Sequence, residues 1–225
     1  MHLEEALSSK MDIKAFIFDM DGLLFDSERI VQRSWEMAGD ELGIPHMGDV
    51  IYHTLGMNRT GRNEYFRKYI REDFPFEEFG RLTRDNFWKI VDKEGLPLKK
   101  GVKELLAYGK AQGYKMAVAT SSSREYAMGN LIRAGIDPYF DSVICGDMVK
   151  KAKPDPEIYQ KASESLGIPP EYCMAFEDAP GGILSAHQAG MKVIMVPDLV
   201  QPTEEIRELT YRVCDSLVDV IGILN

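Results

Sequence analysis

Two carboxylates lie two residues apart directly after an apolar segment near the start of the sequence. Residues 13–18 are mostly apolar, and Asp19, Asp21 and Gly22 come soon after them. Residues i and i+2 of an extended chain face the same side, so the two acids repel each other. Such a pair favours a bound cation, or divides into an ionised nucleophile and a proton carrier. Taken alone, the pattern is equally typical of a strand that ends in solvated acids and a turn glycine.

Hydroxyl side chains and a lysine follow two later apolar segments. Thr120, Ser121 and Ser122 come after residues 116–119. Their hydroxyl and N–H groups could hold phosphate oxygens, although such residues more often cap a helix. Lys153 lies in a proline-containing loop after the next apolar segment. A lysine is a compact positive charge suited to a phosphate, whereas most surface lysines are only solvated. These residues indicate an anion site only if the fold brings them together.

A second acidic pair, Glu177 and Asp178, follows the apolar residues 173–176. Apolar segments and segments of helical periodicity alternate here, which is typical of right-handed βαβ units and a buried parallel sheet. The carboxyl ends of such strands share one edge, where ligands bind. We therefore expect all four polar segments to converge at that edge. Carboxylates from two strands would supply the oxygen ligands that Mg²⁺ prefers.

The elements that must position these residues can be located from periodicity and from glycine and proline punctuation. The fold class is α/β, with a Rossmann-like parallel sheet as its core. The predicted strands are residues 13–18, 116–119, 142–145, 173–176 and 192–196, and the predicted core helices are 124–134, 157–166 and 181–189.

One long segment departs from this alternation. Residues 27–95 contain no convincing strand and indicate several helices instead. The predicted helices are 29–42, 61–71 and 77–92. We expect residues 1–26 and 96–225 to form the α/β core domain and residues 27–95 to form an inserted helical domain.

Composition excludes several classes of function. The formal charge is −9, so no general attraction to nucleic acid or to an anionic membrane is expected. No apolar run approaches the roughly 20 residues that span a bilayer. The three cysteines are far apart and the four histidines lack metal-ligand spacing. We expect a cytoplasmic monomer whose partner is a small phosphorylated metabolite.

The four motifs, in this order, resemble those of the haloacid dehalogenase superfamily, and the resemblance extends over residues 13–217. It implies that Asp19 is the nucleophile that forms an aspartyl-phosphate, and that Asp21 is a general acid and later a base. Thr120 would bind the transferring phosphoryl group, and Lys153 would balance charge between it and Asp19. Covalent catalysis of this kind replaces one difficult displacement with two easier ones.

The resemblance also implies a Mg²⁺ cofactor. Asp19, Asp178 and the main-chain carbonyl of Asp21 would ligate the ion, and Glu177 would act nearby, directly or through water. The segments 18–24 and 176–180 are most similar to the branch that contains pseudouridine 5′-phosphatase and sugar-phosphate phosphatases. That branch points to a substrate class.

The inserted helical domain corresponds, by the same resemblance, to the mobile cap that chooses the substrate in this superfamily. Residues 56–59 look like the cap loop, in which Arg59 would meet the distal part of a sugar phosphate. Arg84 is more typical of a solvated helix face.

The expected function is a Mg²⁺-dependent phosphatase that hydrolyses small phosphate monoesters, of the sugar phosphate or nucleoside monophosphate type. A sugar phosphomutase similar to β-phosphoglucomutase is the nearer alternative, but such mutases carry a histidine where Val31 stands. Carbon–halogen hydrolases of the same superfamily lack the second acid, which this chain has as Asp21, so that activity is not expected. A non-enzymatic binding module would need a broken catalytic set, whereas all the key side chains are present.

Overall fold

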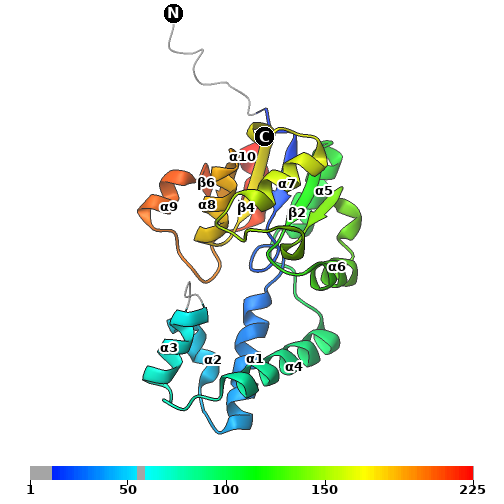
Figure 1. Cartoon of the computed structure of the whole chain (residues 1–225). Coiled ribbons are helices and arrows are strands. Elements are labelled where there is room, and N and C mark those ends of the chain that lie inside the picture. Colours follow the sequence, from blue (N-terminus) through cyan, green and yellow to red (C-terminus); the bar gives the residue numbers. More distant parts are fainter. Residues whose placement is uncertain (1–11, 55–58, 225) are drawn as a thin grey trace, which may run out of the picture. The chain divides into compact units, whose positions relative to one another are not determined.

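The computed structural model describes residues 12–54 and 59–224, except for the side chain of Arg59. Within these residues the chain forms two compact units. One comprises the residues up to Leu24 together with those from Leu98 onward, and the other comprises Phe25–Pro97. The first unit holds a sheet with helices around it and the second is helical (Figure 1).

The sheet of the first unit has six strands, all parallel, in the order β3-β2-β1-β4-β5-β6. Their bounds are β1 Ala15–Phe18, β2 Lys115–Ala119, β3 Ser142–Ile144, β4 Cys173–Glu177, β5 Lys192–Met195 and β6 Arg212–Val213. The predicted α/β class and five of these strands are confirmed. The sequence did not reveal β6, because a strand of two residues is too short to show a period.

The register of the strands sets where their polar ends lie. Phe18, the last residue of β1, pairs with Val118 of β2 and with Phe176 of β4. The segments that follow these three strands therefore begin at the same level of the sheet. This is the edge at which parallel α/β sheets bind ligands.

Helices cover both faces of the sheet (Figure 1). Side chains alternate along β1, so Ala15 and Ile17 join a cluster that includes residues of α7 and α8. Phe16 points to the other face, where its ring stacks on Tyr114 at 4.1 Å between centroids. The helices are α5 Val102–Ala111, α6 Arg124–Arg133, α7 Glu157–Leu166, α8 Pro180–Gln188, α9 Glu204–Leu209 and α10 Leu217–Leu224, with 3₁₀ turns η3 Asp137–Tyr139, η4 Gly146–Met148 and η5 Pro170–Tyr172.

The second unit is a small helical bundle with its own aromatic core. Its elements are α1 Ser27–Leu42, α2 Met47–Val50, η2 Ile51–His53, α3 Arg59–Tyr69 and α4 Phe76–Glu94. Trp35 of α1 packs edge-on against Phe66 of α3 and Phe79 of α4. Gly95, with φ of 74°, ends α4. The regular elements among the described residues of this unit are all α-helices or 3₁₀ turns.

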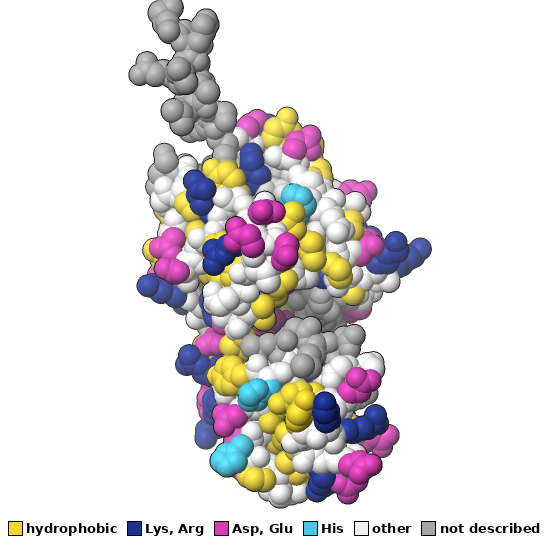
Figure 2. Space-filling model, turned by 90° about the vertical axis from the view of Figure 1, so that its left-hand side faces the viewer, with side chains coloured by type: hydrophobic (Ala, Val, Ile, Leu, Met, Phe, Trp, Pro, Cys, Tyr) yellow, Lys and Arg dark blue, Asp and Glu magenta, His cyan; other side chains and the backbone are white. Residues whose placement is uncertain are grey.

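The distribution of charged side chains on the surface can be compared with the net charge of −9. On the face shown in Figure 2, basic side chains lie dispersed among acidic and apolar ones. Among the described residues, no helix combines the length and the apolar character needed to cross a membrane. Cys145, Cys173 and Cys214 are buried and form no disulfide.

Candidate active site

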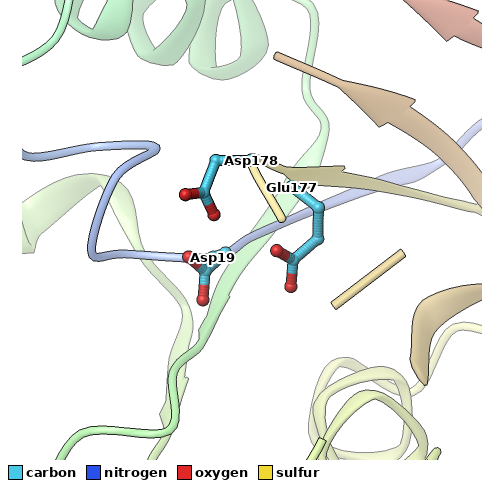
Figure 3. Close-up of side chains that lie close together, drawn as sticks. All are labelled: Asp19, Glu177 and Asp178. Carbon is cyan, nitrogen blue, oxygen red and sulfur yellow. The ribbon is translucent and has the colours of Figure 1, made fainter. Parts of the chain in front are cut away.

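Three carboxylates meet at the carboxyl edge of the sheet. Asp19 follows β1 directly, and its N–H donates to Phe176 O at 2.9 Å, which extends the pairing with β4 by one residue. Glu177 ends β4 and Asp178 comes next. Figure 3 shows the three side chains, and one oxygen from each lies within 4.8 Å of the others. The structure therefore brings together acids that are about 160 residues apart in sequence, as parallel strands with aligned ends require.

Lys153 is held by three acceptors in this site. Its Nζ donates to Asp19 Oδ1 at 2.7 Å, to Glu177 Oε1 at 2.6 Å and to Ala119 O at 3.0 Å. These bonds use all three donors of an ammonium group. Burial lowers the pKa of Lys153, but the charges of Asp19 and Glu177 outweigh that effect and raise the pKa above its usual value. The lysine is thus a fixed positive charge beside Asp19.

Glu177 lies deeper than its neighbours. Its Oε1 accepts a hydrogen bond from the hydroxyl of Tyr159, which is buried in α7, as well as the one from Lys153. Burial, with the charge of Asp19, raises the pKa of Glu177 to about 7 against the opposing effect of Lys153. A Cβ on Gly182 would overlap this carboxyl group, so the glycine gives Glu177 its place. Sequence reasoning missed Tyr159, since one tyrosine in an amphipathic helix carries no signal.

Asp178 completes the acidic cluster. Burial raises its pKa well above the usual value, and the charges of Asp19 and Glu177 add to this effect. Gly22, with φ of +84°, approaches so closely that a Cβ there would overlap Asp178 Oδ2. Lys153 alone cannot balance three carboxylates. Their oxygens and the excess negative charge fit a hard divalent cation such as Mg²⁺.

Asp21 points to different partners. Its two carboxylate oxygens accept hydrogen bonds from Ser122 Oγ at 2.7 Å and from the hydroxyl of Tyr126, in α6, at 2.9 Å. Its carboxylate is not one of the three clustered acids. The N–H of Ser122 donates in turn to Thr120 Oγ1 at 3.1 Å. Asp21, the expected general acid, thus lies beside the hydroxyl residues that follow β2. The sequence did not indicate a role for Tyr126.

The loop after β2 is held by η4, the 3₁₀ turn that follows β3. Gly146 donates its N–H to Ser122 O at 2.8 Å. A Cβ at this glycine would overlap Ser121 O, so only glycine lets the two loops approach this closely. The side chain of Ser121 is exposed.

The helical unit holds three further residues that the sequence analysis singled out, and none of them is placed in the acidic cluster. Arg59 begins α3, but its side chain and residues 56–58 lie outside the described residues. Arg84 is exposed on α4. Val31 of α1 is partly buried and packs against the aromatic core of the unit.

The parallel α/β sheet and its edge of acids, hydroxyls and one lysine form a core of the kind expected from the motifs. Residues 16–196 match the family model described as haloacid dehalogenase-like hydrolase. The chain belongs to this family, and the expected superfamily is confirmed.

Curated relatives cover nearly the whole chain. It is 34% identical to "Putative phosphatase YhcW" of Bacillus subtilis, over 89% of this chain and 90% of that protein. It is 32% identical to "Phosphorylated carbohydrates phosphatase" of Thermotoga maritima, over 81% of this chain and 84% of that protein. Among solved structures, a putative beta-phosphoglucomutase from Thermotoga maritima has a TM-score of 0.80 at 27% identity, over 94% and 98% of the two chains.

Proposed function

We propose that the protein is a Mg²⁺-dependent phosphatase that hydrolyses small phosphate monoesters through an aspartyl-phosphate on Asp19. The observation that carries the proposal is the position of the Asp19 carboxylate, which is bonded to Lys153 and adjacent to Asp178. The names of relatives from Bacillus subtilis and Thermotoga maritima support a phosphatase, and the second supports a phosphorylated sugar as the type of substrate.

In the first step, a carboxylate oxygen of Asp19 attacks phosphorus. An oxygen–phosphorus bond forms, the ester bond to the leaving oxygen breaks, and Asp21 donates a proton to that oxygen. The hydroxyl of Thr120 and the polar groups of Ser121 would bind the phosphoryl oxygens. The fixed ammonium of Lys153 offsets charge on the transferring group without having to reorganise.

In the second step, water attacks the phosphorus of the aspartyl-phosphate. Asp21, now a carboxylate, accepts a proton from the water, the bond from Asp19 to phosphorus breaks, and inorganic phosphate leaves. The proton taken from water leaves Asp21 protonated for the next turnover. The hydrogen bonds from Ser122 and Tyr126 to Asp21 support this role, because they hold its carboxyl group in a defined orientation.

Asp19, Asp178 and the main-chain carbonyl of Asp21 would hold Mg²⁺. When bound, the ion stabilises negative charge on the phosphoryl group. Glu177 contributes its charge from a deeper position, since one of its oxygens already accepts from Lys153 and Tyr159. In this proposal its main task is to keep Lys153 charged and in place.

The helical unit is proposed as the cap of this enzyme, and it would restrict the substrate to a compact sugar phosphate or nucleoside monophosphate. Arg59 would contact the distal end of such a molecule by charge-assisted hydrogen bonds. A phosphoprotein or polynucleotide would be too large for an enclosed site.

The experiment is a phosphate-release assay with a panel of sugar phosphates and nucleoside monophosphates. With Mg²⁺, the wild-type protein and the control Asp215→Asn, which alters an exposed aspartate, should release phosphate. Asp19→Asn should fall to background while circular dichroism shows an intact fold. Ca²⁺ should replace Mg²⁺ poorly, because its larger and looser coordination shell suits in-line transfer less well. Turnover by clean Asp19→Asn, or full activity after exhaustive chelation, would reject the proposal.

A mutase is the second candidate, and the structural similarity to a putative beta-phosphoglucomutase favours testing it. Val31 cannot transfer a proton, and it packs against the core of the helical unit. We therefore expect water to discharge the aspartyl-phosphate. The assay supplies β-glucose 1-phosphate with a trace of the bisphosphate and follows glucose 6-phosphate and free phosphate together. If glucose 6-phosphate forms much faster than free phosphate, the phosphatase proposal is wrong and the mutase proposal takes its place.

A further inference from the structure

A partly buried ion pair lies beside the acidic cluster and has no role in the reaction proposed above. Asp198 follows β5, and Lys99 precedes α5. Lys99 Nζ lies 2.6 Å from Asp198 Oδ1, and the side chains of Lys99 and Asp198 are only 24% and 13% exposed. Both residues belong to the unit that carries the sheet. Forming such a pair requires removing two charges from water, so its place near the site calls for an explanation.

The second oxygen of Asp198 indicates that explanation. Oδ2 is buried and has no hydrogen-bond partner among the described residues. The point where a Cβ would lie on Gly22 is 3.5 Å from this oxygen, and the same point overlaps Asp178 Oδ2. The two carboxylates therefore border the same small space above Gly22.

A buried carboxylate oxygen without a donor has lost its hydrogen bonds to water and gained none in return, which is costly. A divalent cation at the acidic cluster would remove this cost in two ways. Its charge would attract Asp198, and Mg²⁺ usually keeps several waters, which are hydrogen-bond donors of the kind that Oδ2 lacks. Lys99, bonded to the other oxygen, offsets part of this attraction.

We propose that Asp198 is an outer carboxylate of the metal site, which strengthens Mg²⁺ binding without ligating the ion, and that Lys99 weakens that binding. This inference rests on the proposed Mg²⁺ site at Asp19 and Asp178. It gives the pair a function in setting the charge of the site. A purely structural pair would have no such effect on the ion.

The test is calorimetric titration of chelator-treated protein with MgCl₂, so that the readout is metal affinity. Asp198→Asn leaves the charge of Lys99 beside the site and should weaken binding by about tenfold or more, the scale set by about 1.4 kcal/mol. Lys99→Met leaves the charge of Asp198 unopposed and should tighten binding by about threefold to tenfold. The double variant removes both charges and should return within about threefold of the wild type.

Controls separate this inference from folding effects and from the function it rests on. Lys115→Met breaks a surface ion pair with Asp141 and should leave Mg²⁺ affinity unchanged. Asp178→Asn should abolish binding. If Asp178→Asn binds like the wild type, or the wild type does not bind, the metal site itself fails, and this inference with it.

If Asp178→Asn abolishes binding but Asp198→Asn does not weaken it, only the role of Asp198 is overturned. The same holds if folded Lys99→Met weakens Mg²⁺ binding instead of tightening it, because the loss of either partner of a purely structural pair leaves an unpaired charge that disturbs the site. Unfolding temperatures with chelator show which variants are folded. If Lys99→Met is unfolded, Lys99→Gln removes the same charge, keeps a polar group beside Asp198, and decides by the same sign of its effect on Mg²⁺ affinity.

Discussion

Gly22 offers a sharp test of the site, because two separate effects of a side chain there can be told apart. Its φ of +84° is in the left-handed region, which costs an alanine roughly 1–2 kcal/mol. For a chain of this size that lowers the unfolding temperature by about 2–8 °C. In addition, the Cβ of Gly22→Ala would overlap Asp178 Oδ2, which must move by about 1 Å or more to regain normal contact.

Gly113 is the matched control. Its φ is +78°, in the turn between α5 and β2, and a Cβ there meets nothing within 4 Å. Gly113→Ala therefore has the backbone cost of Gly22→Ala without the overlap. We expect it to lose a similar 2–8 °C in unfolding temperature, about what 1–2 kcal/mol produces, and to keep its activity within about twofold.

For Gly22→Ala we expect kcat/KM for phosphate release to fall by about a hundredfold or more, the usual effect of a 1 Å misplacement in an active site. Raising the Mg²⁺ concentration should restore part of that loss, since Asp178 is a proposed ligand. The assay measures unfolding by circular dichroism and phosphate release over a range of Mg²⁺ concentrations. Equal activity of Gly22→Ala and Gly113→Ala would show that the position of Asp178 does not matter to the reaction.

Two further predictions concern buried groups. Tyr159→Phe removes a hydrogen bond to the charged Glu177, so we expect it to cost about 1.5–3 kcal/mol in unfolding free energy and to lower kcat by about tenfold, because Lys153 is less firmly placed. Tyr211→Phe, at an exposed tyrosine, should change neither, and equal effects of the two would contradict the role of Tyr159. Burial raises the pKa of all three thiols, that of Cys173 to about 12, so the native protein should react with iodoacetamide at pH 8 far more slowly than the unfolded chain. Rapid labelling of the native protein would show that these thiols are accessible.

Most of the sheet could be predicted, since strands of four or five buried residues show clear apolar runs. β1 and β4 fall within one or two residues of the predicted bounds. The convergence of Asp19 with Asp178 was also predictable, because aligned parallel strands bring their carboxyl ends to one edge. β6 and α2 escaped prediction, because two and four residues are too few to establish a period.

The sequence by itself determined which chemical groups stand at the strand ends, and local periodicity was enough to place those ends together. Only the tertiary structure decided which groups contact each other there. Asp21 turns to Ser122 and Tyr126, Glu177 bonds to Tyr159, and Lys99 meets Asp198. Each contact joins segments far apart in sequence. Such contacts depend on how helices and loops pack over the sheet, and the spacing of residues along one strand or helix carries no information about that packing.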